Sequence, residues 1–279
     1  MDVRPMRPGD VRPLAALTRD AWGQPGEDRA TEVALATPRI AHLLGTDPGG
    51  AWTAVDADGA VAGGALALVR DGVWGLSLLI VREDVRSGGV GRRLLEAALT
   101  HADGARGGII LSSTDPRAMR RYARAGFALR PCVAACGIVA RDRLRPPDGV
   151  REGSLDDVPE TVAASRHVRG ARHDVDLPTM LSHPRRRLLV HEHGFAVHQE
   201  GSPQLLAATG EAAARELLWA CFAASRPGAT VTAEFVTAGQ DWAIEVALEA
   251  GLALSPDGPV FVRGDVGPMA PYLPSGAYL

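Results

Sequence analysis

Three glycines lie between an apolar, strand-like run and a helix-like segment, in the stretch Arg86-Ser87-Gly88-Gly89-Val90-Gly91-Arg92. Glycine lets a backbone approach an anion closely, and the unbonded N–H groups of a first helical turn point towards it. The stretch therefore predicts a phosphate-binding loop, with a plain strand-to-helix turn as the alternative. A P-loop is excluded because no Gly-Lys-Ser/Thr follows, and Leu94 stands where a dinucleotide fingerprint needs a glycine.

Further along the chain, the pattern predicts a short helix with a tyrosine on its inward face. Asp115 is a good N-cap, Pro116 suits the first helical position, and Gly126 can close the helix in a left-handed conformation. The apolar residues of this segment fall at helical spacing, and Tyr122 shares their face. Such a tyrosine is either part of the core or a proton donor, and its position alone does not decide.

The elements around these motifs predict an α+β fold. Three strand-like runs joined by the hairpin signals Asp58-Gly59 and Asp71-Gly72 are followed by helix, strand, helix and strand. We therefore expect a mixed, mostly antiparallel sheet flanked by helices. The predicted elements are 51–56, 60–70, 73–81, 92–102, 108–112, 116–125 and 128–139.

Short sequence matches indicate a duplication. Val3-Arg4 recurs 147 residues later, and Ala125-Gly126 recurs 125 residues later. A polar stretch with two adjacent prolines separates the copies. We predict a first domain at 1–143, a linker at 144–149 and a second domain at 150–279. The second copy is expected to contain strands or helices at 187–197, 204–208, 211–225, 230–237, 242–250 and 260–263.

Composition limits the classes of function. With 46% apolar and 23% charged residues, the 279-residue chain can bury a core, whereas a net charge of -3 and 5% aromatic residues argue against nucleic acid as a partner. Three cysteines without a C-x-x-C pair do not suggest zinc or a disulfide framework. No signal-like segment and no run of roughly 18 apolar residues is evident, so we expect a cytoplasmic protein that does not use a membrane.

Two polar clusters in the second half have less specific interpretations. His191 and His193 would share one face of a predicted strand, but no third ligand is evident, so we expect no metal. The stretch from Arg166 to Asp176 is expected to be a solvated helix end, with the lining of an acceptor cleft as the alternative.

Together the two motifs resemble those of the GNAT superfamily of N-acetyltransferases. The family has Arg/Gln-x-x-Gly-x-Gly/Ala after its fourth strand and later Asn-x-x-Ala-x-x-x-Tyr-x-x-x-Gly-Phe. The matching residues are Arg86, Gly89 and Gly91, then Ala118, Tyr122, Gly126 and Phe127, with Asp115 at the Asn position. The resemblance covers residues 3 to about 140 and, with the duplication, implies two tandem GNAT-like domains.

The resemblance implies acetyl-CoA as the acyl donor. Its pyrophosphate would lie on the glycine loop, and its pantetheine arm would pair with the preceding strand, where an N–H group would stabilise the oxyanion. Tyr122 would protonate the departing thiolate. The implied cofactor-binding residues are Leu79, Ile80, Val81, Arg86, Ser87, Gly88, Gly89, Val90, Gly91, Arg92 and Asp115.

The general base has two candidates. Many relatives use a Glu on the fourth strand, but residues 74–79 contain no acid and Glu83 lies beyond the strand, so a chain of waters is the default. The second candidate is the carboxylate of Leu279, because the tail is apolar and semi-rigid and some tandem relatives place a terminal carboxylate in the active site. The alternative is that the tail only packs between domains. Glu27, Asp28 and Glu32 could attract a cationic amine or could be solvated helix acids.

The second copy lacks both motifs. Thr209, Ala212 and Ala214 align with the three motif residues of the loop, and Ala247 aligns with Tyr122. We therefore expect the second copy to keep the fold without binding CoA productively.

Two functions from different classes fit these patterns. The first is an N-acetyltransferase that acts on an amine of a small molecule or on a peptide amino group. The second is a non-catalytic CoA-binding or interaction module. A homodimer and an acyl group other than acetyl remain open.

Overall fold

The computed structural model describes residues 1–23, 28–86 and 88–279, and their contacts divide the chain into two compact units. Unit 1 is Met1–Ala105 and unit 2 is Arg106–Leu279. The domain boundaries predicted at 143 and 149 rest on the repeated sequence and stay a prediction.

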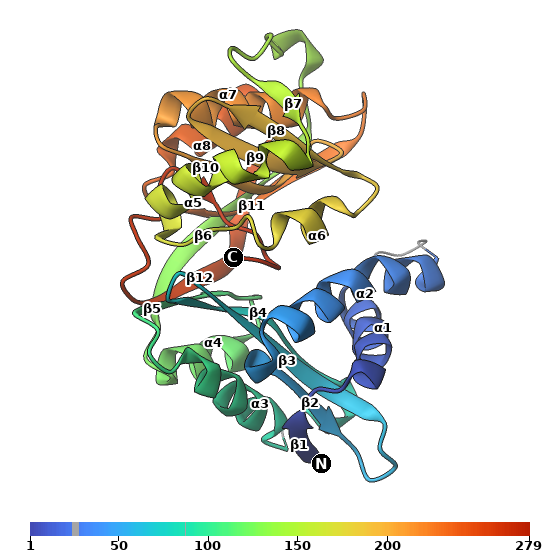
Figure 1. Ribbon diagram of the computed structural model, residues 1–279. Helices are drawn as coiled ribbons and strands as arrows, with labels where there is room; N and C mark the ends of the chain where they lie inside the picture. The colour runs from blue at the N-terminus through green and yellow to red at the C-terminus, as the bar shows by residue number, and fades with distance from the viewer. Residues whose placement is uncertain (24–27, 87) are drawn as a thin grey trace. The chain divides into compact units, whose positions relative to one another are not determined.

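Unit 1 contains four antiparallel strands in the order β1-β2-β3-β4. These are β1 (Asp2–Pro5), β2 (Ala51–Val55), β3 (Val61–Arg70) and β4 (Val73–Val81) (Figure 1). Asp71 and Gly72 join β3 to β4, and both have positive φ angles, 44° and 77°. A two-residue hairpin needs this conformation to match the twist of its strands, which is why Asp-Gly predicts the turn.

Helices cover both faces of these strands. α1 (Val11–Trp22) and α2 (Arg29–Thr46) share an apolar core with β3 and β4. Leu14 and Leu43 contribute from the helices, and Leu66 and Leu78 contribute from the strands. α3 (Val90–Leu99) lies on the opposite face (Figure 1).

A buried ion pair fixes the end of α2 against β3. The carboxylate of Asp47 accepts hydrogen bonds from Arg70 Nη1 at 2.8 Å, from Val69 N at 2.9 Å and from the Thr46 hydroxyl at 2.6 Å. Asp47 is 3% exposed and Arg70 is 6% exposed. Burial raises the pKa of Asp47, but these hydrogen bonds and the charge of Arg70 outweigh it, so its pKa lies below the ordinary value.

Unit 2 contains two groups of antiparallel strands. One group has the order β5-β12-β6-β11 and the other β13-β10-β9-β8-β7. The strands are β5 (Gly107–Leu111), β6 (Ala128–Ile138), β7 (Arg151–Gly153), β8 (Arg186–His191), β9 (Gly194–Gln199), β10 (Ser202–Ala208), β11 (Thr230–Thr237), β12 (Ala253–Gly264) and β13 (Tyr272–Leu273).

The helices of unit 2 lie between some of these strands along the chain. α7 and α8 bury Leu217, Phe222 and Trp242 in one apolar core with Leu206 of β10 and Ala233 of β11. The helices are α4 (Pro116–Arg124), α5 (Thr161–Arg169), α6 (Leu177–Leu181), α7 (Glu211–Ala223) and α8 (Asp241–Glu249). The predicted α+β class is confirmed, and among the described residues no helix is long and apolar enough to span a membrane.

The last strands of the two sequence repeats are exchanged within unit 2. β12 lies between β5 and β6, and β6 pairs on its other side with β11 (Figure 1). Cys132 of β6 faces Asp257 of β12, and these two residues are related by the repeat offset of 125. The last strand of each repeat therefore pairs with a strand of the other repeat. Because equivalent residues face each other, the two halves of this strand group are related by a local pseudo-twofold axis.

Two strand predictions need correction. The predicted strand 187–197 is a hairpin, β8 and β9, joined by Glu192 and His193, which carry none of the usual Asn-Gly or Asp-Gly turn signal. The predicted strand 260–263 extends back to Ala253, because β12 passes the sequence Pro256-Asp257-Gly258-Pro259 with a register irregularity instead of ending there.

Replacing Asp47 with Asn should lower the free energy of unfolding by about 3–5 kcal/mol, because Arg70 then stays buried without its counter-charge. The wild type should lose stability as pH falls through the lowered pKa of Asp47, and the Asn variant should lack this component. Urea unfolding at several pH values measures both. Asp58→Asn, in an exposed turn, is the control and should change little; equal stability of the Asp47 variant would contradict the argument.

Candidate active site

The predicted phosphate loop joins β4 to α3 in unit 1. Gly89 is the N-cap of α3 and has left-handed angles, φ 76° and ψ 0°. Its carbonyl accepts hydrogen bonds from the N–H groups of Arg92 and Arg93, both at 3.1 Å. The N–H groups of Val90 and Gly91 have no carbonyl to bond within the helix, so they can receive an anion. Ser87, also predicted here, lies outside the described residues.

Positive charge surrounds this helix start. Arg86, Arg92 and Arg93 are exposed, and the Arg86 side chain is held along the strand by a bond from Nε to Val81 O of 3.1 Å. Arg92 Nε lies 3.7 Å from Glu96 Oε1, and this exposed ion pair contributes little to stability. The loop therefore presents backbone donors and guanidinium groups together, as a diphosphate requires.

The end of β4 supplies backbone, not side chains, for the predicted pantetheine contact. Ile80 is buried in the core that α1 and α2 share with the strands, and Leu79 and Val81 are half-buried. β4 pairs with β3 along its length, and alternate N–H and C=O groups of its backbone point away from β3. These groups are the ones that could pair with an extended ligand.

Ser77 is a residue that sequence reasoning missed. The register of β3 and β4 shifts so that Ala67 faces Leu76 and Leu66 faces Leu78, which leaves Ser77 opposite no residue, as in a β-bulge. Its hydroxyl is buried and has no hydrogen-bond partner among the described residues. The sequence offered one signal that could have identified it: Ser77 is the one polar residue in the otherwise apolar strand β4.

Tyr122 lies on the buried side of α4 in unit 2. It is 5% exposed and meets Phe261 edge to face, with ring centroids 5.5 Å apart. Burial raises the pKa of Tyr122 to about 12, so the phenol keeps its proton at neutral pH. The group is therefore available as a proton donor.

Two of the predicted acids act as helix caps. Asp115 caps α4 by accepting from Arg117 N at 2.8 Å, and its carboxylate also pairs with the Arg117 guanidinium. Asp28 caps α2 by accepting from Thr31 N at 2.8 Å. Glu32 lies half-buried in the first turn of α2, and Glu27 lies outside the described residues.

Leu279 is buried in unit 2. Its backbone oxygen bonds to His173 Nε2 at 2.6 Å and also contacts the Arg169 guanidinium. Arg169, His173 and Asp176 are each at most 1% exposed, so the expectation of a solvated helix end is wrong at these positions. Arg169 and His173 are buried because they bond to the C-terminal tail, a contact that the sequence pattern did not show.

His191 and His193 do not share a strand. His191 ends β8 and His193 is in the following turn, where its N–H donates to His191 Nδ1 at 3.0 Å. Among the residues that the structure describes, no group of three His, Cys, Asp or Glu side chains could hold a metal ion.

The second repeat differs from the first at both motifs. Only Thr209 and Gly210 join β10 to α7, whereas residues 82–89 join β4 to α3. Gly210 is extended, with φ -162° and ψ 155°, so the left-handed cap of Gly89 has no counterpart there. Ala247, buried in α8, stands at the position of Tyr122.

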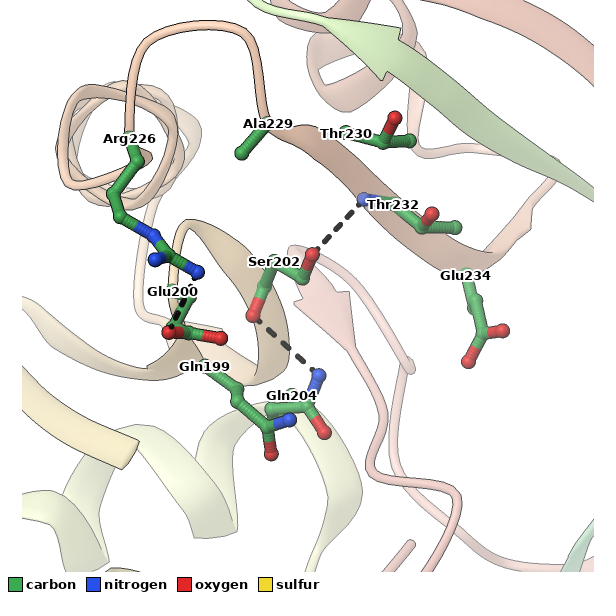
Figure 2. Close-up of a pocket in the computed structure, with 9 residues that line it drawn as sticks. All are labelled: Gln199, Glu200, Ser202, Gln204, Arg226, Ala229, Thr230, Thr232 and Glu234. Atoms are coloured by element: carbon green, nitrogen blue, oxygen red, sulfur yellow. Dashed lines mark hydrogen bonds and ion pairs between the residues drawn. The ribbon is translucent and has the colours of Figure 1, made fainter. Parts of the chain in front are cut away.

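A polar hollow of about 330 Å³ also lies in unit 2 (Figure 2). Arg226 and Glu200 form an ion pair at its edge, and Ser202 Oγ accepts from Thr232 N at 3.0 Å across it. None of the predicted site residues lines it. The lining residues are Gln199, Glu200, Ser202, Gln204, Arg226, Ala229, Thr230, Thr232 and Glu234.

Comparison with known proteins gives a match to one family model and to solved structures of similar fold. Residues 14–127 match the model of the acetyltransferase (GNAT) family. No curated protein matches the chain. The matched range includes both the glycine loop at 86–92 and the segment 115–127 that contains Tyr122.

Solved structures share the fold at low identity. A putative acetyltransferase from Pyrococcus horikoshii superposes with a TM-score of 0.80 at 16% identity, over 100% of this chain and 95% of its own. A GCN5-related N-acetyltransferase from Sphaerobacter thermophilus gives 0.56 at 17%, over 94% and 95%. Eis1 from Mycobacterium abscessus gives 0.57 at 14%, over 95% and 74%. The predicted fold of two tandem GNAT-like domains is confirmed.

Ultraviolet titration should show that Tyr122 stays un-ionised until pH approaches about 12. Because Tyr272 is also buried and has a raised pKa, the comparison is between the wild type and Tyr122→Phe, which removes a single phenol. As pH rises above 10.0, the unfolded chain loses this proton first, so Tyr122 makes stability fall with pH. An ionisation near 10.0 in the native protein that disappears in Tyr122→Phe would overturn the assignment.

Proposed function

We propose that the protein is an N-acetyltransferase, because residues 14–127 match the model of the acetyltransferase (GNAT) family, which supports acyl transfer in general. It would move the acetyl group of acetyl-CoA to an amine of a small molecule or to an exposed amino group. The observation that carries the proposal is the start of α3, where the N–H groups that follow a left-handed Gly89 have no carbonyl to bond within the helix and lie beside three exposed arginines.

The donor would be held by the backbone of unit 1. The N–H groups of Val90 and Gly91 would bond the diphosphate, and Arg86 and Arg92 would add charge. The groups of Leu79, Ile80 and Val81 that point away from β3 would pair with the amides of the pantetheine arm. One such N–H group would donate a hydrogen bond to the thioester oxygen and so stabilise the negative charge that develops on it.

In the proposed reaction the acceptor nitrogen attacks the thioester carbon directly. The new C–N bond forms, the C–S bond breaks, and the sulfur leaves as the CoA thiolate. Tyr122 gives its phenolic proton to that thiolate and recovers a proton from water, while the proton lost by nitrogen passes to water. A neutral phenol is required for this role, and burial provides it.

Water is the proposed proton acceptor, and Leu279 is the second candidate base. The Leu279 oxygen already bonds to Arg169 and His173 within unit 2. Contact with a guanidinium makes an oxygen less basic. These bonds favour a structural role for Leu279, in which its oxygen fixes the C-terminal tail to Arg169 and His173.

Arg86→Ala combined with Gly89→Glu should abolish or weaken acetyl-CoA binding by at least about 10-fold. The change removes one charged contact, places a carboxylate at the helix start, and forces a side chain into a left-handed position. Calorimetry on wild type and variant measures it. Arg12→Ala with Gly59→Glu is the matched control, because Gly59 also has positive φ in open space. Wild type that binds no CoA, or a variant with unchanged affinity, would contradict the donor site.

Tyr122→Phe should lower kcat by about 10²–10⁴-fold and leave the KM for acetyl-CoA nearly unchanged. The ring contact with Phe261 is kept, so the fold should survive. Steady-state kinetics with a panel of amines provides the test, with Arg124→Ala on the outer face of the same helix as the control. Full turnover by Tyr122→Phe would remove its role, and CoA binding with no turnover of any amine would favour the non-catalytic module.

A further inference from the structure

Gln240 occupies in the second repeat the place that Asp115 occupies in the first. The two residues are 125 positions apart, the same offset that relates Cys132 to its partner Asp257. Asp115 is the N-cap of α4, and Gln240 is the N-cap of α8. Sequence offset, helix position and strand pairing therefore agree on the correspondence.

The side chain of Gln240 is committed to the chain's own backbone. Gln240 is fully buried; its Nε2 donates to Met269 O at 2.5 Å, and its Oε1 accepts from Tyr272 N at 3.2 Å. Trp242 Nε1 also donates to Oε1, at 2.7 Å. One amide thus holds the backbone on both sides of residues 270 and 271.

The same segment pairs with β10, the strand that corresponds to β4. Leu206 faces Leu273 and Ala207 faces Tyr272 in antiparallel register, and Ala208 N donates to Pro271 O at 3.3 Å. β13 also contacts β11. The segment therefore lies along β10, in contact with the strand that follows α7.

We propose that the edge of β10 is a binding site whose ligand is the chain's own segment 269–273. This inference rests on the proposed function, because the segment takes beside β10 the place that the pantetheine arm is proposed to take beside β4. An extended peptide and a pantetheine arm both offer amide groups along a line, so one strand edge and one polar N-cap side chain can hold either.

Burial and hydrogen bonding at both ends of the segment favour its permanent pairing with β10. Met269, Tyr272 and Leu273 are each at most 4% exposed, and the Tyr272 hydroxyl bonds to His173 Nε2 at 3.0 Å. The two-residue link at Thr209 and Gly210 offers no loop for a diphosphate. A tethered segment also has a high effective concentration at this strand edge. The intact chain should therefore bind one CoA, in the first repeat.

A disulfide crosslink tests whether segment 269–273 stays paired with β10. Leu206→Cys with Leu273→Cys, in a Cys136→Ser background that removes the exposed cysteine, places two thiols at facing positions of an antiparallel pair. The Cα separation in such a pair is within disulfide range. Mild oxidation should link the folded variant completely, and the stoichiometry of CoA should be one per chain before and after oxidation.

Other results decide against the proposal. A folded variant that does not crosslink would overturn it, and so would two CoA per chain that fall to one on oxidation. Absence of CoA binding in every form would instead count against the proposed function, because the crosslink yield is still readable by mass spectrometry. The single Leu206→Cys variant controls for crosslinks to Cys132 and Cys221.

Hydrogen exchange gives an answer without core substitutions. In the wild type, the amides of Ala208 and Tyr272 should be protected and should stay so at saturating CoA. Gln240→Ala should speed exchange of the Tyr272 amide at least about 10-fold, and Gln204→Ala, which changes a glutamine on the neighbouring hollow, should not. Loss of protection on adding CoA would show that the cofactor displaces the segment and would overturn the proposal.

Discussion

The antiparallel pairing of β6 with β12 is the contact on which the architecture of unit 2 depends. It places the last strand of each repeat against the fifth strand of the other, with Cys132 and Asp257 face to face near the centre. Neither repeat can complete its strand group alone, so both must fold together. Such an exchange also covers strand edges that would otherwise be open to aggregation.

This exchange allows the two repeats to diverge in chemistry while keeping a common frame. The first repeat retains a glycine-capped helix start with arginines around it, which suits a diphosphate. In the second repeat, only two residues lie between β10 and α7. The pairing of the strands does not depend on the length of this link, so both repeats can keep the same order of elements.

The residues at the equivalent N-caps show how one position can take two roles. Asp115 is a carboxylate, which can only accept hydrogen bonds, and it is bonded to Arg117 at the surface. Gln240 is an amide, which donates and accepts, so it can bond a carbonyl and an N–H group of one passing backbone. Burial makes those two bonds obligatory, since an unpaired amide in the core would be costly. Burial of the Gln240 amide therefore favours the paired position of the segment beside β10.

The sequence by itself determined the features that depend on neighbouring residues. Asp71-Gly72 predicts its hairpin because both residues tolerate positive φ, and Asp115, Pro116 and Gly126 mark the ends of α4 through local hydrogen bonds and φ preferences. The glycine loop and the inward face of Tyr122 were predictable for the same reason, and the duplication was visible as repeated short matches. The Glu192-His193 turn was not, because neither residue favours a turn.

Only the tertiary structure decided which distant segments meet. Periodicity shows which face of a strand is buried but not which strand lies beside it, so two repeats with the same pattern can exchange strands without any change in sequence signal. The burial of Arg169 and His173 depends in the same way on a tail more than a hundred residues away. Nor could any local pattern show that Gln240 would bond to residues 269 and 272, since that contact exists only once β13 has paired with β10.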